Sequence, residues 1–181
     1  MDLININLNG CIYFARIAMA YFQEGSDGSQ PPSKCLTMIS SAAAFQEAPG
    51  MPGYAASKVA ILGMMRSIKA IAPTTNNARV NVICPWATET NMTKSHNHIF
   101  KDNDIPLQGP DDVAKFIQQV TADPKINGKV VYVGAYRAFD IEEGLERTLP
   151  EWLGQVNVDL WAKQTEAFSK GAKVRTPTIP V

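Results

Sequence analysis

Residues 79–84 read Arg79-Val80-Asn81-Val82-Ile83-Cys84, a short and largely apolar run that Pro85 ends. Two further runs have the same character, Cys35-Leu36-Thr37-Met38-Ile39-Ser40 and Lys129-Val130-Val131-Tyr132-Val133. Short apolar runs of this kind are typical of parallel strands that are buried on both faces. We therefore predict three buried parallel strands at these positions.

Helical patterns separate the three predicted strands. Apolar residues recur at helical spacing from Leu3 to Phe22. A second helix is predicted from Tyr54 to Ala72, ended by Pro73, and a third begins at Pro110 and is closed by Pro124. The alternation of helix and strand predicts an α/β fold, a parallel sheet of about three strands with flanking helices and right-handed crossovers.

The chain changes character after Ala135. Between Pro150 and Gly171, five apolar residues lie at roughly helical spacing, namely Leu153, Val156, Leu160, Trp161 and Phe168. This pattern predicts a docking helix, with a lid or a subunit-contact element as the alternative. We therefore divide the chain into a core, residues 1–135, and a helical tail, residues 136–181.

Charge and hydropathy exclude several kinds of partner. Lys+Arg and Asp+Glu number 17 each, so the formal net charge is zero, and no run of like charge suggests a nucleic-acid or membrane surface. Polar residues interrupt the apolar segment from Met1 to Phe22, which is therefore neither a signal peptide nor a membrane span. We expect a cytoplasmic protein.

The cysteines and histidines do not predict a metal site or a disulfide framework. Cys11, Cys35 and Cys84 are far apart and lie in apolar stretches, which favours reduced thiols. His96 and His98 lack a cluster of other ligands at metal-binding spacing and fall in a polar stretch without a clear period. We interpret both histidines as loop residues.

Acid/base chemistry is indicated at the edge of the sheet where the strands end. Tyr54 and Lys58 stand four residues apart at the start of a helix and share a face. An ammonium held near a phenol favours the phenolate, so such a pair can act as a general acid/base. Ser41 follows the first strand, where its hydroxyl could orient a substrate oxygen, although a turn or helix-cap serine is the alternative.

These residues resemble the motifs of the short-chain dehydrogenase/reductase family. Ser41, followed after twelve residues by Tyr54-Ala55-Ala56-Ser57-Lys58, resembles the catalytic serine and the Tyr-x-x-x-Lys motif of that family. Asn7-Leu8-Asn9-Gly10 is similar to its helix-borne Asn-x-x-Gly motif, and Thr90 lies where the family has a threonine on the nicotinamide. The resemblance covers residues 3 to 134 and is closest to the 15-hydroxyprostaglandin dehydrogenase-like group. It implies the C-terminal half of a Rossmann-like, doubly wound sheet.

The resemblance also implies a reaction and a role for each residue. The reaction is hydride transfer between a secondary alcohol or ketone and NAD or NADP. Tyr54 is the implied acid/base, Ser41 steadies the substrate oxygen, and Asn7 holds a proton-relay water against Lys58. Lys58 serves both Tyr54 and the nicotinamide ribose, while Tyr54, Lys58, Pro85 and Thr90 form the implied cofactor contacts. A homodimer through the helices 3–22 and 54–72 is implied as well.

The sequence departs from the family in two respects. The 181 residues contain no G-x-x-x-G-x-G turn for the cofactor pyrophosphate. We therefore expect an N-terminally truncated relative, short of about 80 to 110 residues by the usual size of βαβ units, with impaired cofactor binding. The first predicted strand would then form an exposed edge. Trp86 stands where the family usually has glycine, and its indole either narrows the nicotinamide site or points outward.

Two other functions remain open at this point. A cofactor-independent isomerase or cyclase would need only the proton transfer of Tyr54, Lys58 and Ser41. A non-catalytic dimerisation module would need only the two interface helices. For the oxidoreductase, hydroxylated fatty acids, steroids and polyketide-like secondary metabolites all fit as substrates.

Overall fold

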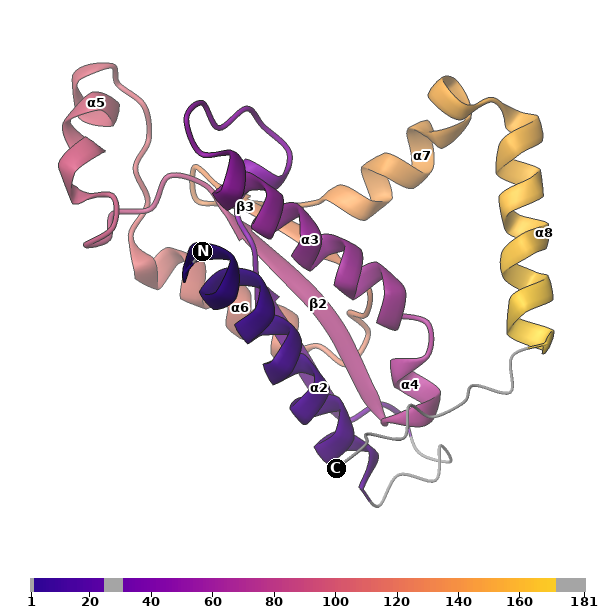
Figure 1. Cartoon of the computed structure of the whole chain (residues 1–181). Helices are drawn as coiled ribbons and strands as arrows, with labels where there is room; N and C mark the ends of the chain where they lie inside the picture. The colour runs from indigo at the N-terminus through magenta and orange to yellow at the C-terminus, as the bar shows by residue number, and fades with distance from the viewer. Residues whose placement is uncertain (1, 25–30, 172–181) are drawn as a thin grey trace. The chain divides into compact units, whose positions relative to one another are not determined.

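The computed structural model describes residues 2–24 and 31–171, with side chains described up to residue 168. Contacts divide the chain into two compact units, residues 1–142 and residues 143–181, which are described separately. Figure 1 shows the elements in chain order by colour.

The first unit alternates helices and strands. It begins with an uninterrupted helical segment made of α1 (Asp2–Ile4), the π-helical η1 (Asn5–Asn9) and α2 (Gly10–Gln23). The next elements are β1 (Lys34–Ile39), η2 (Ala42–Ala44), α3 (Pro52–Ile68), α4 (Ala72–Thr75) and β2 (Ala78–Pro85). Then come η3 (Lys94–His96), α5 (Asn97–Asp102), α6 (Pro110–Ala122), β3 (Val130–Gly134) and β4 (Arg137–Asp140).

The strands form one four-stranded sheet in the order β1-β2-β3-β4. The first three strands are parallel, as predicted, and their bounds agree with the three apolar runs to within one or two residues. The predicted α/β fold class is therefore confirmed. β4, which the sequence analysis did not predict, pairs antiparallel with β3 through a turn in which Ala135 and Tyr136 both have positive φ.

Two separate apolar layers cover the two faces of the sheet. Alternate residues of β2 point to opposite sides, so Val80, Val82 and Cys84 belong to one layer and Ile83 belongs to the other. The first layer contains Ala15 of α2 and Ile61, Leu62 and Met65 of α3. The second contains Val113 and Val120 of α6. Figure 1 shows α2 and α3 on the near side of β2 and α6 on the far side.

The polar residues of β2 face α6, and they bond to backbone carbonyls there. Buried Arg79 donates from Nη1 to the carbonyl of Ile126 at 2.8 Å and from Nη2 to that of Thr121 at 2.7 Å. Asn81 donates to Ile126 O and accepts from the backbone N–H of Lys129. These contacts satisfy the Thr121 carbonyl at the end of α6, which the helix itself leaves unpaired, and the Ile126 carbonyl in the loop that follows.

The positions of α3 and α6 correct one prediction. β1, β2 and β3 follow one another across the sheet in a single direction, yet the helix of the first connection and the helix of the second lie on opposite faces. The two crossovers therefore have opposite hands. The prediction that both are right-handed is wrong, because the preference for that hand yields here to the need to cover the second face of β2.

Several predicted boundaries also need correction. α3 ends at Ile68 rather than Ala72, and Pro73 lies in the first turn of the short helix α4 instead of ending a helix. Proline fits there because the first helical turn needs no N–H donor. The histidines are not loop residues, since His96 ends η3 and His98 lies in α5.

The end of the first unit is fixed by ion pairs. The carboxylate of Glu142, which is almost fully buried, accepts from Arg66 Nη2 at 2.6 Å and lies 3.5 Å from Lys69 Nζ. Both cations belong to α3 or directly follow it. The first turn of α7 (Ile141–Leu153) is thereby attached to α3.

The second unit contains most of α7 and all of α8 (Gln155–Gly171). The single predicted helix after Pro150 is wrong, because Gly154 adopts φ +82° and separates two helices. A glycine in this left-handed conformation commonly ends a helix. The side chains of Val156, Leu160, Trp161 and Phe168 on α8 are exposed.

Within the described residues, no helix is long and apolar enough to cross a membrane. The three cysteines are free, and Cys84 is fully buried.

Candidate active site

Two serines follow β1 at the carboxyl edge of the sheet. The backbone N–H of Ser40 donates to Ile83 O at 2.8 Å, which continues the pairing with β2. Its buried hydroxyl donates to the carbonyl of Lys58 at 2.8 Å. Ser40 therefore fixes the start of α3 against the end of β1. This role is not readable from the sequence, because nothing in the local pattern shows which of two adjacent serines points at a helix.

Ser41 caps the short helix η2. Its backbone is extended, with φ −164°, and its hydroxyl oxygen accepts from the backbone N–H of Ala43 at 3.2 Å. The capping role that the sequence left as an alternative is thus present in the structure. Because the hydroxyl only accepts in this contact, its proton remains able to donate to a substrate oxygen.

Tyr54 and Lys58 lie on the first turns of α3, which Pro52 opens. Lys58 Nζ lies 5.5 Å from the centre of the Tyr54 ring and donates to the carbonyl of Ile39, the last residue of β1, at 3.4 Å. The ammonium is therefore held between the phenol ring and the end of the strand.

Burial lowers the pKa of Lys58, because desolvation disfavours its charge. The nearby thiols Cys11 and Cys84 act in the opposite direction on the same pKa. The pKa of the Cys84 thiol is raised to about 11, and desolvation by burial is the largest cause of this shift. The thiol is therefore protonated at neutral pH, so Lys58 has no fully charged partner among these neighbours.

Asn7 lies inside the π-helical turn η1. The backbone N–H of Gly10 bonds to Asn5 O, which widens the helix at this point. Asn7 Nδ2 lies 3.4 Å from the hydroxyl of Ser57, which itself donates to Tyr54 O at 2.7 Å. The π-helical turn thus directs Asn7 toward the helix that carries Tyr54 and Lys58, and π-helical turns are frequent at functional sites.

Pro85, Trp86 and Thr90 lie at the end of β2 and in the loop after it. Pro85 is the last residue of the strand, and the backbone N–H of Trp86 donates to Val133 O at 2.8 Å. The Trp86 indole packs edge-on against Phe100 of α5, with 6.4 Å between ring centres. Its contact partner is therefore α5, which the sequence analysis did not foresee.

Thr90 is exposed, and its contacts are made within its own loop. Its backbone N–H donates to the hydroxyl of Thr93 at 2.9 Å, and Thr93 donates in turn to the carbonyl of Thr88 at 2.7 Å. In the structure, the Lys58 ammonium therefore contacts the Tyr54 ring directly, whereas Asn7 contacts their helix through Ser57. Ser41 and Thr90 are fixed by their own loops at the ends of neighbouring strands.

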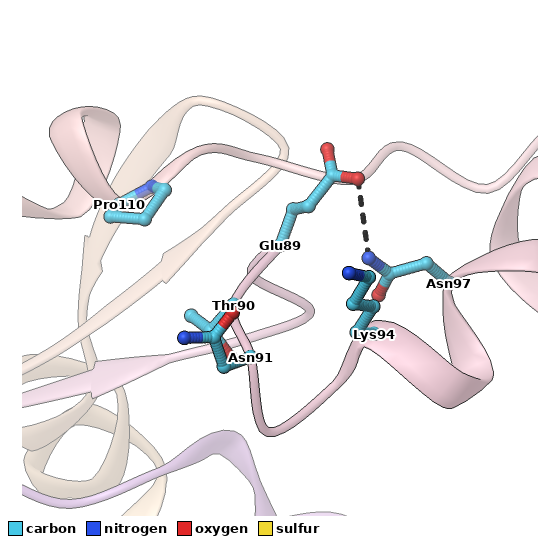
Figure 2. Close-up of a pocket in the computed structure, with 6 residues that line it drawn as sticks. All are labelled: Glu89, Thr90, Asn91, Lys94, Asn97 and Pro110. Atoms are coloured by element: carbon cyan, nitrogen blue, oxygen red, sulfur yellow. Dashed lines mark hydrogen bonds between the residues drawn. The ribbon is translucent and has the colours of Figure 1, made fainter.

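A polar pocket of about 530 Å³ lies beside Thr90 and was not predicted. Figure 2 shows its lining residues, which are Glu89, Thr90, Asn91, Lys94, Asn97 and Pro110. No sequence signal identifies this pocket, since it forms only where the loop after β2 meets the start of α6. Among the described residues there is no cluster of three or more ligands that could hold a metal ion.

This chain is similar to known proteins of one family. The sequence matches the short chain dehydrogenase family over residues 1–99. It is 23% identical over 171 residues to 5'-hydroxyaverantin dehydrogenase of Dothistroma septosporum, which covers 91% of this chain and 55% of that protein.

Solved structures share the fold. 3-Hydroxyacyl-CoA dehydrogenase type-2 from Mycobacterium avium superposes with a TM-score of 0.64 at 25% identity, covering 72% of this chain and 52% of that chain. 4-Hydroxyisoleucine dehydrogenase complexed with NADH and succinate superposes with a TM-score of 0.60 at 23% identity, with 72% and 55% covered. The chain thus spans about half the length of the relatives it matches. Since the family match extends over more than half of the 181 residues, and the sheet with its helices is that of solved relatives, this chain belongs to the short-chain dehydrogenase/reductase family.

Proposed function

We propose that this chain carries the acid/base centre of an NAD(P)-dependent oxidoreductase that interconverts secondary alcohols and ketones. The observation that carries the proposal is the position of the Lys58 ammonium, 5.5 Å from the Tyr54 ring and bonded to the end of β1. In an open α/β sheet, ligands bind beyond the carboxyl ends of the strands, where this pair lies. Membership of the family supports the same reaction class.

Each residue then has a chemical role. A bound nicotinamide cofactor supplies or accepts the hydride. Tyr54 Oη gives a proton to the ketone oxygen, or takes one from the alcohol, and the Lys58 ammonium stabilises the phenolate that results. The Ser41 hydroxyl donates to the same substrate oxygen. Asn7, directed by the π-helical turn, holds a water through which Lys58 exchanges protons with solvent.

The residues present fit the nicotinamide end of the cofactor. The Lys58 ammonium lies at the end of β1, and the exposed Thr90 follows the neighbouring strand β2. Both side chains offer hydrogen bonds suited to a ribose hydroxyl and a carboxamide. Lys58, Pro85 and Thr90 would hold that end, together with Tyr54. The pyrophosphate end is different, because these 181 residues contain no G-x-x-x-G-x-G turn.

We therefore expect the 181-residue chain to bind NADH and NADPH weakly. Losing the pyrophosphate contacts costs several kcal/mol, and each 1.4 kcal/mol is about tenfold in affinity. Fluorescence titration of the chain with each cofactor measures this directly. Micromolar binding would contradict the expectation and would require a phosphate site elsewhere in these residues.

The acid/base assignment is tested by Tyr54→Phe. The variant keeps the ring beside Lys58 and removes only the hydroxyl. With NADH or NADPH at millimolar concentration and a panel of aliphatic and aromatic ketones, we expect turnover to fall by about a hundredfold or more. Tyr21→Phe, which removes an exposed hydroxyl on α2, is the matched control. Unchanged turnover in Tyr54→Phe would refute the proposed mechanism.

Substrate class and assembly are part of the same proposal. The similarity to 5'-hydroxyaverantin dehydrogenase supports a hydroxylated secondary metabolite as substrate. The 15-hydroxyprostaglandin dehydrogenase-like grouping and a cytoplasmic location stay predictions. A homodimer through residues 3–22 and 54–72 is supported by the exposed apolar residues of this first helical segment, namely Ile6, Tyr13, Phe14, Ile17 and Tyr21.

A further inference from the structure

A polar cluster lies on the α6 side of β1, near the start of the strand. Leu36 and Met38 belong to the first apolar layer, so the alternate residues Cys35 and Thr37 point to the opposite face. Thr37 Oγ1 lies 2.9 Å from Thr121 Oγ1 of α6, which agrees with this direction. The thiol of Cys35 is free and partly exposed. The cluster thus contains a reachable thiol that the proposed reaction does not use.

A buried guanidinium lies next to this thiol. Arg79 is directly opposite Cys35 in the parallel register of β1 and β2, so the two side chains share the α6 face. Arg79 is only 4% exposed, and its Nη atoms donate to the carbonyls of Val120, Thr121 and Ile126. Its Nε has no partner, and no carboxylate of the described residues forms an ion pair with it. A buried cation and a buried N–H donor therefore lack an acceptor that carries negative charge.

The Asn81 amide presents a second donor to the same thiol. Asn81 Oδ1 accepts from the backbone N–H of Lys129 at 3.0 Å, which fixes the orientation of the amide. Asn81 Nδ2 lies 3.7 Å from Cys35 Sγ, and Thr37 Oγ1 lies 3.5 Å from the same sulfur. An amide nitrogen can only donate, so the sulfur is the acceptor. Partly exposed thiols in electropositive surroundings of this kind are the ones that peroxides oxidise.

We propose that Cys35 is a site of reversible oxidation, at which hydrogen peroxide converts the thiol to a sulfenic acid. The sulfur attacks one peroxide oxygen, the O–O bond breaks and an S–O bond forms. The leaving hydroxide takes the thiol proton, so the products are the sulfenic acid and water. The new oxygen accepts hydrogen bonds, and Arg79 Nε–H is an unpaired donor on the same face of the sheet. This donor distinguishes Cys35 from an ordinary partly exposed thiol.

Cys11 and Cys84 are internal controls in the same chain. Both lie with the first apolar layer, on the other face of the sheet from Arg79. Cys11 is partly exposed like Cys35, but desolvation raises the pKa of Cys11, and the Lys58 charge only partly offsets this effect. Cys84 is fully buried. Neither thiol shares the donors that surround Cys35, so both should be oxidised more slowly.

Peptide mapping of the full 181-residue chain tests the site. The chain is treated with hydrogen peroxide and dimedone, which traps sulfenic acids covalently, and the labelled peptides are measured by mass spectrometry. Cleavage after lysine and arginine places the three cysteines in separate peptides, residues 1–16, 35–58 and 80–94. We expect Cys35 to be labelled about tenfold faster than Cys11, and Cys84 to stay unlabelled. In urea all three should be labelled at similar rates, because unfolding removes their different surroundings.

Substitution of Arg79 tests the role of the guanidinium. Arg79→Lys keeps a positive charge but removes the Nε–H donor, so we expect the labelling of Cys35 to slow severalfold while that of Cys11 is unchanged. Arg137→Lys, at an exposed position of β4, is the matched control and should label as the parent does. If Arg79→Lys does not fold, Thr37→Val removes the hydroxyl beside the sulfur and should also slow the labelling of Cys35.

Three outcomes would overturn the proposal. The first is labelling of Cys11 as fast as that of Cys35 in the folded parent. The second is a preference for Cys35 that persists in urea, since local sequence would then explain it. The third is undiminished labelling of Cys35 in a folded Arg79→Lys chain or, where that variant does not fold, in Thr37→Val.

Discussion

Lys58 carries a charged group in a partly buried position, where desolvation disfavours the charge. Its pKa is lowered from 10.5 chiefly by desolvation, so the folded chain binds the proton less tightly than the unfolded chain does. At a pH below the folded pKa both states are protonated, and the folded state carries the full cost of the buried charge. As pH rises toward 10.5 the folded state loses the proton first, and this cost disappears.

We therefore predict that Lys58→Met raises the free energy of unfolding at pH 7, and that the gain shrinks as pH approaches 10.5. Urea unfolding of both proteins at several pH values between 7 and 10.5 measures the difference. Lys125→Met, at an exposed position, serves as the control for loss of a lysine. A difference that stayed constant or grew with pH would show that the ammonium is not penalised by burial.

The sequence predicts Tyr54, Lys58 and Ser41 as an acid/base set, because a phenol and an ammonium four residues apart share a helix face and Ser41 follows a strand. Ser40 carries no such signal. Its role depends on which carbonyl of α3 lies opposite it. Contacts of this kind are set by tertiary packing, which local sequence does not encode.

At the scale of elements, two glycine positions differ in whether their backbone conformation requires glycine. Gly128 has φ +72° in the turn before β3, and a Cβ there would lie 2.6 Å from the Lys69 side chain. Gly63 lies in the interior of α3, and a Cβ there would meet nothing within 4 Å. The first position needs glycine for its backbone conformation, whereas the second does not.

We predict that Gly128→Ala lowers the free energy of unfolding by about 1 to 2 kcal/mol, while Gly63→Ala raises it by up to about 1 kcal/mol. Urea unfolding of the two variants beside the parent is the measurement. The pair is its own control, since both changes add one methyl group. Equal effects of the same sign would contradict the backbone argument.

The sequence predicts some elements of the fold better than others. β2 and β3 are largely buried, and β1 buries Leu36 and Met38, so burial leaves an apolar pattern in all three strands. β4 reads Arg137-Ala138-Phe139-Asp140 and pairs with one neighbour at the sheet edge, so its burial is low and its pattern weak. The helix break at Gly154 was missed because the apolar spacing continues on both sides of it.

At the scale of the whole molecule, the exposed apolar side chains of η1 and α2 need an explanation. Ile6, Tyr13, Phe14, Ile17 and Tyr21 are all exposed and lie on this one helical segment. Exposed apolar patches of this kind commonly mark protein interfaces. The homodimer proposed above would bury them against a second copy.

We predict that light scattering after gel filtration gives twice the chain mass of 19.8 kDa for the parent. Replacing both Phe14 and Ile17 with Glu should give the monomer mass, because two carboxylates would then be desolvated at the interface. Arg16→Glu adds a carboxylate at an exposed polar position of the same helix and should remain dimeric. A monomeric parent would refute this assembly.

The two apolar layers lie on opposite faces of the sheet, and they can be completed at different times during synthesis. Apart from Val130, every fully buried member of the first layer lies at or before Cys84, whereas the second layer needs Val113, Val120, Val131 and Val133. A ribosome adds residues from the N-terminus at about 5 to 20 per second, and segments can fold as they emerge. One side of the sheet can thus close during synthesis, several seconds before the helix that covers the other side has been made.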